Sequence, residues 1–376
     1  MRRSIDSPTS LITGNNRSYQ LLNDFLPTTR LILPKPPPVT DFFVPYVAKF
    51  SPHDLLRIAT AGEGGRLAFI RGDIAVQNDS QFLPINTAVV AGNAIYDLTF
   101  LPDPSVICIG SGDQTVRFID TTTFKVVNTY SYHKGTPQTL CPFNDGVLSG
   151  GKDGQVCFWD RRAPSPNFSI QMKNSASVSS VVSPTHDIFI TGDSHGKIFA
   201  WDPRSPKTPF FVPIQKTETK NPIINLSLSP NGKMMAALTA NNTLNIYSLD
   251  GYWRYVSQQW PKIGAFYGRT CFSPDSKYII TGSGNYAVCM FSVALDRDPN
   301  LLLGHSSPVT CVEWCKDVFE ILLSCSDDKT IQIWIASSEL APEKEPEIEP
   351  FVSSDQSGNQ EKPPSVTKVY TLHHFL

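Results

Sequence analysis

Short hydrophobic runs separated by glycine-rich and acidic turns extend along most of this chain. In residues 148–162 (LSGGKDGQVCFWDRR), two such runs flank Asp153-Gly154, and Val156 and Phe158 alternate with other residues on the second run. Alternation with a period of two is typical of a strand with one buried face, and Asp-Gly between two runs favours a tight hairpin. The segment therefore predicts two antiparallel strands, which we interpret as half of a four-stranded unit.

The turn acid Asp153 and the large residue six positions later, Trp159, mark a pattern that recurs in seven units. The pairs are Glu63/Phe69, Asp113/Ile119, Asp153/Trp159, His195/Trp201, Asn241/Tyr247, Asn285/Phe291 and Asp328/Trp334. Successive turn positions lie 50, 40, 42, 46, 44 and 43 residues apart. This interval is the length of a four-stranded propeller blade and does not match helical or leucine-rich repeats.

A proline eleven residues before the turn position is a third mark, and six of the seven units carry it. These prolines are Pro52, Pro102, Pro142, Pro184, Pro230 and Pro274, and Asp317 stands at the same place in the seventh unit. Proline presets φ, and the small polar residues that mostly follow it favour a chain reversal. The three marks together predict an all-β, seven-bladed WD-repeat β-propeller with loops on two opposite faces. We expect blades near 43–75, 92–130, 133–164, 177–212, 223–256, 265–297 and 304–336.

Two units carry polar residues at the spacing of the hydrogen-bonded tetrad of WD repeats. One set is His305, Ser324, Asp328 and Trp334, and the second is His133, Ser149, Asp153 and Trp159. We expect the histidine to satisfy a buried turn carboxylate, the hydroxyl to extend the network and the indole to anchor the third strand. Each such bond contributes roughly 0.5–1.5 kcal/mol net. Units with Asn, His or Glu at the turn are expected to depend more on apolar packing.

The composition divides the chain into an N-terminal segment (1–42), the repeats (43–336) and a tail (337–376). The N-terminal segment contains a short helix candidate, Ser18–Phe25, a strand candidate, Thr29–Leu33, and a proline-rich spacer. The tail is rich in Glu, Pro and Ser, which predicts a disordered segment.

The last repeat supplies only three strands before the chain leaves it at Ile335, so its blade needs a fourth strand from elsewhere. We expect Thr29–Leu33 to supply it. The alternative is Val366–Leu372, but the connection to that segment is longer and costs more loop-closure entropy.

Net charge narrows the class of partner, and cysteine usage narrows the cellular compartment. The formal net charge is −2, which indicates no direct nucleic-acid partner and no membrane-surface partner. The eight cysteines fall mostly on expected strands, so we interpret them as reduced core thiols of a cytosolic or nuclear protein. The start of the chain has no apolar signal-peptide region, and no run of 18 apolar residues occurs, so we expect neither secretion nor a membrane span.

The sequence contains few residue patterns that would indicate a catalytic or metal site. Cys311 and Cys315 have no second pair at metal-ligand spacing, and the glycine-rich runs join strands instead of opening a helix. We therefore expect no catalytic residues, no metal site, no cofactor and no enzymatic activity.

Two successive repeats end in Trp159-Asp160-Arg161-Arg162 and Trp201-Asp202-Pro203-Arg204. These stretches resemble the Trp-Asp-x-Arg signature of WD-repeat substrate receptors of cullin-4 ubiquitin ligases. The resemblance implies that Asp160, Arg162, Asp202 and Arg204 bind the adaptor of the ligase. One departure is that His195 stands where the second copy of the pattern has its turn acid.

The flanking residues are similar to the denticleless receptors among these proteins. The similar stretches include Gly150–Gly154, Ala265–Tyr267, and the run from Leu302 to Ser306 with Cys325–Trp334. The resemblance implies docking on the damaged-DNA-binding adaptor and cullin-4, with recognition of degron substrates held on the replication sliding clamp. It implies a nuclear location, and the cytoplasm stays open as an additional one.

Other interpretations stay open at this point. A generic WD-repeat scaffold of another multiprotein complex is the main alternative, and a propeller enzyme is the alternative from another class. In addition, Lys368–Leu376 loosely resembles a clamp-binding peptide, although it lacks a leading glutamine.

Overall fold

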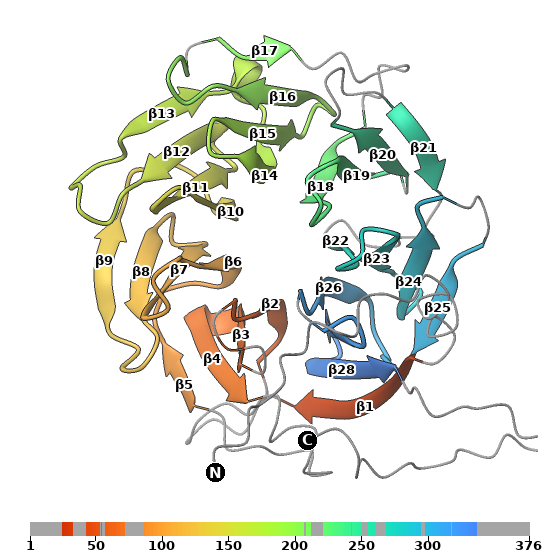
Figure 1. Cartoon of the computed structure of the whole chain (residues 1–376). Helices are drawn as coiled ribbons and strands as arrows, with labels where there is room; N and C mark the ends of the chain where they lie inside the picture. Colours follow the sequence, from red (N-terminus) through yellow and green to blue (C-terminus); the bar gives the residue numbers. More distant parts are fainter. Residues whose placement is uncertain are drawn as a thin grey trace, which may run out of the picture.

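Seven four-stranded antiparallel sheets are arranged in a ring around a central axis (Figure 1). The computed structural model describes residues 25–32, 43–52, 54, 57–71, 86–206, 208–211, 221–241, 243–249, 255–259, 268–294, 298–316 and 318–336. The predicted all-β, seven-bladed propeller is therefore confirmed.

Each blade runs from an inner strand beside the axis to an outer strand at the rim. The first three blades are β2–β5 (Pro45–Phe50, Arg57–Gly62, Arg66–Arg71, Asn86–Val89), β6–β9 (Ile95–Phe100, Val106–Ser111, Val116–Asp120, Val126–Tyr130) and β10–β13 (Pro137–Phe143, Gly146–Gly151, Gln155–Trp159, Phe168–Gln171). The next two are β14–β17 (Val178–Thr185, Ile188–Asp193, Ile198–Trp201, Phe210–Phe211) and β18–β21 (Ile223–Leu228, Met234–Thr239, Leu244–Ser248, Tyr255–Gln259). The sixth is β22–β25 (Thr270–Phe272, Tyr278–Gly282, Ala287–Ser292, Asn300–Leu303). The seventh combines β26–β28 (Val309–Trp314, Ile321–Ser326, Thr330–Ala336) with β1 (Phe25–Ile32). Short 3₁₀ turns lie at Glu63–Gly65 and Lys173–Ser175.

Two outer strands lie beyond the limits that the sequence predicted. β5 lies within the stretch from residue 76 to residue 90 that we expected to be an insertion, and β25 follows the expected end of the sixth blade at residue 297. Both strands are four residues long, and most of their residues are partly or fully exposed. A short rim strand carries little hydrophobic alternation, which explains why the pattern did not locate it.

The ring closes between the two ends of the repeat region. β1 pairs antiparallel with β28, from Phe25 opposite Ala336 to Ile32 opposite Thr330, and it lies at the rim outside β28 (Figure 1). This confirms that an N-terminal strand completes the seventh blade, although the strand begins four residues before Thr29. The pairing shifts register between Pro27 and Thr29, where proline has no N–H to donate. Residues 18–24 of the helix candidate, the proline-rich spacer and residues 337–376, including Val366–Leu372, lie outside the described residues.

The core consists of apolar clusters that join neighbouring blades. The indole of Trp159 is fully buried and packs with Tyr130, Phe118 and other residues of the second blade. Trp334 packs in the same way against the sixth blade, in a cluster with Tyr278 and Met290. The large residue at the end of the third strand therefore anchors its blade to the preceding one. No helix among the described residues is long and apolar enough to cross a membrane.

Polar side chains on the inner strands form a second set of contacts between blades. Asp97 Oδ2 accepts a hydrogen bond from Leu140 N at 2.7 Å in the next blade. In the following blades, Thr139 Oγ1 accepts from Val181 N at 3.2 Å, Ser180 Oγ from Leu226 N at 2.9 Å, and Asn225 Oδ1 from Thr270 N at 3.1 Å. Each of these acceptors directly follows a register shift of its strand. Such irregularities re-aim a side chain, here towards the neighbouring blade.

We expect deletion of residues 1–34 to expose the edge of β28 and destabilise the whole propeller. Loss of the paired backbone groups should lower the Tm by about 5 °C or more, or cause aggregation. The matched control deletes residues 337–376 and should leave the Tm within error. Thermal denaturation of the two deletions measures this, and the reverse outcome would show that the C-terminal segment closes the ring.

Candidate protein-binding site

The structure brings each predicted tetrad into one chain of hydrogen bonds. In the third blade, His133 Nδ1 lies 3.0 Å from Asp153 Oδ2 and its Nε2 lies 2.7 Å from Ser149 Oγ. Trp159 Nε1 donates to the same hydroxyl at 2.7 Å. A carboxylate only accepts, so in the neutral imidazole Nδ1 carries the proton and Nε2 accepts from the serine. The network therefore runs in one direction from the indole to the carboxylate.

The tetrad of the seventh blade has the same geometry. His305 Nδ1 lies 3.0 Å from Asp328 Oδ2, its Nε2 lies 2.7 Å from Ser324 Oγ, and Trp334 Nε1 donates to that hydroxyl at 2.8 Å. Burial raises the pKa of Asp328, but hydrogen bonds from His305, Thr330 and the backbone of Ser306 outweigh burial and hold the pKa well below its usual range. The carboxylate is therefore stabilised in its charged form.

The fourth blade replaces the turn acid in a way that the sequence pattern missed. Trp201 Nε1 donates to Thr191 Oγ1 at 2.9 Å, so the indole and hydroxyl remain. Asp193 is 2% exposed and lies two residues before His195, and its Oδ1 accepts from the backbone N–H groups of His195 and Lys197. Burial raises the pKa of Asp193. Asp193, at the end of the second strand, therefore supplies the carboxylate of this turn, although His195 occupies the expected position.

Arg162 lies in a tight turn directly after β12. The turn closes through a bond from Ala163 N to Asp160 O at 2.9 Å. Arg162 Nε donates to Asp160 Oδ1 at 2.9 Å and Nη2 donates to Oδ2 at 2.8 Å, a bidentate pair. These hydrogen bonds lower the pKa of Asp160 to about 2. The Arg162 side chain is 72% exposed, so its fixed guanidinium faces solvent.

Arg204 repeats this geometry after β16 in the next blade. Its Nε donates to Asp202 Oδ1 at 2.9 Å, its Nη2 donates to Oδ2 at 2.8 Å, and the side chain is 73% exposed. The Arg204 side chain hydrogen bond lowers the pKa of Asp202. β12 and β16 lie in neighbouring blades (Figure 1). Both turns follow a third strand, so both lie on one face of the ring, which we call the arginine face.

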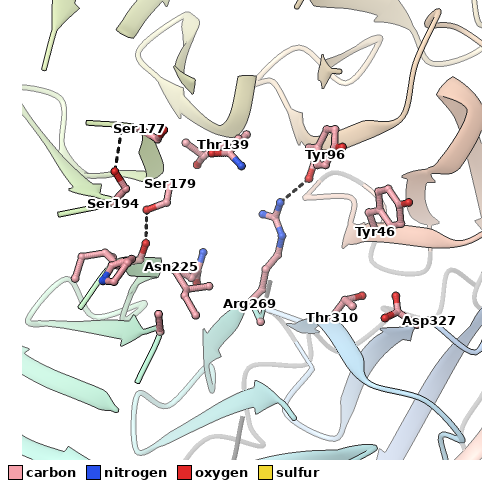
Figure 2. A pocket seen from close by; sticks show the side chains of 16 residues that line it. Tyr46, Tyr96, Thr139, Ser177, Ser179, Ser194, Asn225, Arg269, Thr310 and Asp327 are labelled. Carbon is pink, nitrogen blue, oxygen red and sulfur yellow. Dashed lines mark hydrogen bonds between the residues drawn. The ribbon is translucent and has the colours of Figure 1, made fainter. Parts of the chain in front are cut away.

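The opposite end of the axis holds a cavity of about 480 Å³ (Figure 2). Asp327 lies at its edge, in the connection between β27 and β28, so it belongs to the opposite face from the arginine turns. Tyr46 and Tyr96 line the same cavity, with ring centroids 5.9 Å apart. Lys152 Nζ lies 5.7 Å from the Tyr96 ring centroid, so a cation of this chain already lies beside that ring. Burial, and then the neighbouring Asp328, raise the pKa of Asp327.

Arg269 lies across the axis and forms part of both axial cavities (Figure 2). Its Nη2 donates to Tyr96 O at 2.8 Å, and its Nη1 lies 3.0 Å from Asp97 Oδ1. The second cavity, of about 310 Å³, opens toward the arginine face and is also lined by Lys49 and Glu313. Lys49 Nζ lies 3.3 Å from the same Asp97 oxygen. Arg269 therefore links the sixth blade to the second and lines both axial cavities.

The cysteines are free thiols, and seven of the eight are buried. Burial raises the pKa of the Cys141 and Cys271 thiols to about 12, so these two groups stay protonated at neutral pH. Within the described part of the chain, no three His, Cys, Asp or Glu side chains gather as a metal site.

Comparison with known proteins agrees with the fold. A family model described as "WD domain, G-beta repeat" matches residues 86–120, 124–160 and 298–334. Each matched stretch begins with the outer strand of one blade and continues through three strands of the next. The chain is therefore a WD-repeat β-propeller protein.

Within this class the chain is similar to denticleless proteins. It is 24% identical over 290 residues to "Denticleless protein homolog" of Mus musculus, covering 64% of this chain and 40% of that protein. Against the protein of the same name in Danio rerio it is 24% identical over 286 residues, covering 64% and 44%. "Cell division cycle protein cdt2" of Schizosaccharomyces pombe is 24% identical over 290 residues, covering 65% of this chain and 58% of that protein. The matches thus span about two fifths to three fifths of these relatives.

We expect replacement of Asp328 by Asn to destabilise the protein in a pH-dependent manner. Because the folded-state pKa of Asp328 is lowered, its contribution is present above the unfolded value of about 4 and is lost as the pH falls. The difference in unfolding free energy between the parent and Asp328→Asn should therefore be largest near pH 7 and shrink below about pH 4.

Asp327→Asn is the matched control, because the pKa of Asp327 is shifted in the opposite direction. A raised pKa means that ionisation of this group opposes folding, so the control should not lose stability near pH 7. Urea denaturation between pH 7 and pH 3 measures both variants. A difference for Asp328→Asn that does not change with pH would contradict the assigned role of its charge.

Proposed function

We propose that this protein is the substrate-recognition subunit of a cullin-4 type ubiquitin ligase. The observation that carries the proposal is the pair of arginine turns, at Arg162 and Arg204, which have the same bidentate Asp–Arg geometry and lie on one face of two neighbouring blades. The similarity to denticleless proteins supports the same class of function. In this proposal the protein is a non-catalytic receptor that acts in the nucleus.

The arginine face is proposed to dock on the damaged-DNA-binding adaptor of the ligase. A guanidinium is planar and presents several N–H groups, so it can bind carboxylates and carbonyl oxygens in a fixed geometry. Asp160 and Asp202 each occupy one edge of their arginine and hold it in position. The exposed remainder of each guanidinium stays available to the adaptor. A side chain that is already ordered loses less entropy on binding.

The opposite face is proposed to receive the substrate, in complex with the replication sliding clamp. Among the described residues, Tyr46, Tyr96 and Asp327 line the mouth of the cavity there. Aromatic rings and a carboxylate attract a cation, and the raised pKa of Asp327 falls when a cation approaches. We therefore expect this mouth to accept a substrate segment with a basic side chain.

The mechanism that follows is one of proximity. Adaptor and cullin-4 on one face would hold the ubiquitin-transfer machinery near a substrate bound on the other. A lysine kept close to a reactive centre reacts at a much higher effective concentration. The propeller needs only to be rigid and to keep its two faces apart, which the closed ring provides.

We expect the double variant Arg162→Ala, Arg204→Ala to fold normally and to lose the adaptor. Exposed substitutions usually change stability by no more than about 0.5 kcal/mol. Removal of an arginine from a desolvated charged interface weakens binding by about 30- to 5,000-fold. The measurements are the Tm and recovery of adaptor and cullin-4 in an affinity pull-down.

Lys125→Ala is the control, because it removes a cation from the corresponding connection of the second blade. It should bind the adaptor normally. If the double variant retains the adaptor fully, the protein is a WD-repeat scaffold of another complex.

Substitution of Asp327 by Asn should weaken substrate binding without affecting the adaptor. Loss of one charge-assisted contact corresponds to about tenfold in affinity, and the effect should diminish at high salt. Titration of clamp-bound degron peptide measures this, and Asp298→Asn at the rim is the control. Unchanged affinity of Asp327→Asn for the peptide would show that the substrate does not bind at the mouth of this cavity.

A further inference from the structure

Tyr130 contacts the turn that carries Arg162 from the neighbouring blade. It ends β9, the outer strand of the second blade, and is 6% exposed. Its ring centroid lies 4.9 Å from that of Trp159, the residue directly before the turn. Its hydroxyl donates to Ala163 O at 3.0 Å, with Asp160 O at 3.3 Å as the second acceptor. These two carbonyls bracket the turn, so one hydroxyl holds both of its ends.

A second contact attaches the same turn to the second blade. Arg161 Nη1 donates to Asp103 Oδ2 at 2.7 Å, and Asp103 belongs to the connection between β6 and β7. The Asp103 carboxylate also accepts hydrogen bonds from the Ser105 hydroxyl and backbone N–H. The Ser105 side chain, its backbone N–H and Arg161 lower the pKa of Asp103 to about 2. The turn is therefore attached at two separate points.

The turn that carries Arg204 has neither attachment among the described residues. Val116 pairs with Tyr130 in the second blade, and the equivalent pair in the third blade is Val156 with Ile170. Isoleucine has no hydroxyl, and Pro203 replaces the charged side chain of Arg161. Apart from Asp202, the ion-pair partner of Arg204 is Asp187 at 3.8 Å, and both side chains are more than 70% exposed.

We propose that Tyr130 is a positioning residue of the adaptor-binding surface, which acts through the turn of Arg162. The two turns are then not equivalent: both arginines are held by their aspartates, but only the turn of Arg162 is also attached to the neighbouring blade before binding. A contact that is ordered in advance costs less entropy to form. The link to the adaptor rests on the proposed function, whereas the ordering of the turn can be tested without it.

The first test measures the turn itself, by native-state trypsin cleavage. Tyr130→Phe keeps the packed ring and removes the hydroxyl. Loss of one net hydrogen bond should raise local opening, and thus cleavage after Arg161 and Arg162, by about fivefold. Cleavage after Arg204 should not change. Tyr132→Phe is the matched control, because its hydroxyl bonds Ser169 at 3.2 Å and its ring also contacts Trp159, without reaching the turn.

The second test measures adaptor affinity in a double-mutant cycle. Tyr130→Phe should weaken binding of the adaptor by about fivefold in the parent and have no further effect in the Arg162→Ala background. An equal loss in both backgrounds would show a general structural role and overturn the proposal. Unchanged cleavage after Arg162 would also overturn it. If the parent does not bind the adaptor, the proposed function fails, and the cleavage rates still decide whether Tyr130 orders the turn.

Discussion

Pairing of β1 with β28 is the contact on which the rest of the propeller depends. The matched WD-repeat stretches are offset from the blades, because each supplies the outer strand of one blade and three strands of the next. The last repeat therefore leaves the seventh blade without an outer strand, and residues 25–32 supply it. Each blade contacts its neighbours, so an open seventh blade would leave the ring unclosed and a strand edge exposed.

Ring closure also holds the inner strands around the central axis and separates the two faces of the propeller. The bonds from Asp97, Thr139, Ser180 and Asn225 connect inner strands of successive blades, and Arg269 spans the axis between the sixth blade and the second. Turns after third strands lie on the arginine face, while turns between second and third strands lie around the other mouth. Because antiparallel strands alternate in direction, these two sets of connections cannot share a face. The proposed receptor would bind adaptor and substrate at once, and this separation of the faces leaves each partner its own surface.

The sequence predicted those features that depend on residues close in the chain. The turn acids, the aromatic residues six positions later and the tetrads of the third and seventh blades all have a fixed local spacing, and the structure brings each tetrad together. The short outer strands β5 and β25 were misplaced, because four largely exposed residues carry no clear alternation. In the fourth blade the acid moved to Asp193, and the signal was an aspartate two residues before the expected turn position.

Contacts between blades could not be read from the sequence. Tyr130 lies 33 residues from Ala163, and Arg269 lies 173 residues from Tyr96. No local spacing connects such pairs, because only the closed ring brings them together. For the same reason, the two arginine turns look alike in sequence, although the second blade attaches only the first of them among the described contacts.

The most direct test of the proposed two-faced receptor is whether adaptor and substrate bind independently. The measurement is the Kd of the sliding clamp loaded with degron peptide, with and without saturating adaptor. Binding on opposite faces of a rigid ring predicts a coupling free energy near zero and a Kd unchanged within about twofold. Loss of peptide binding in the presence of the adaptor would show that the two partners compete for one face and would contradict the account.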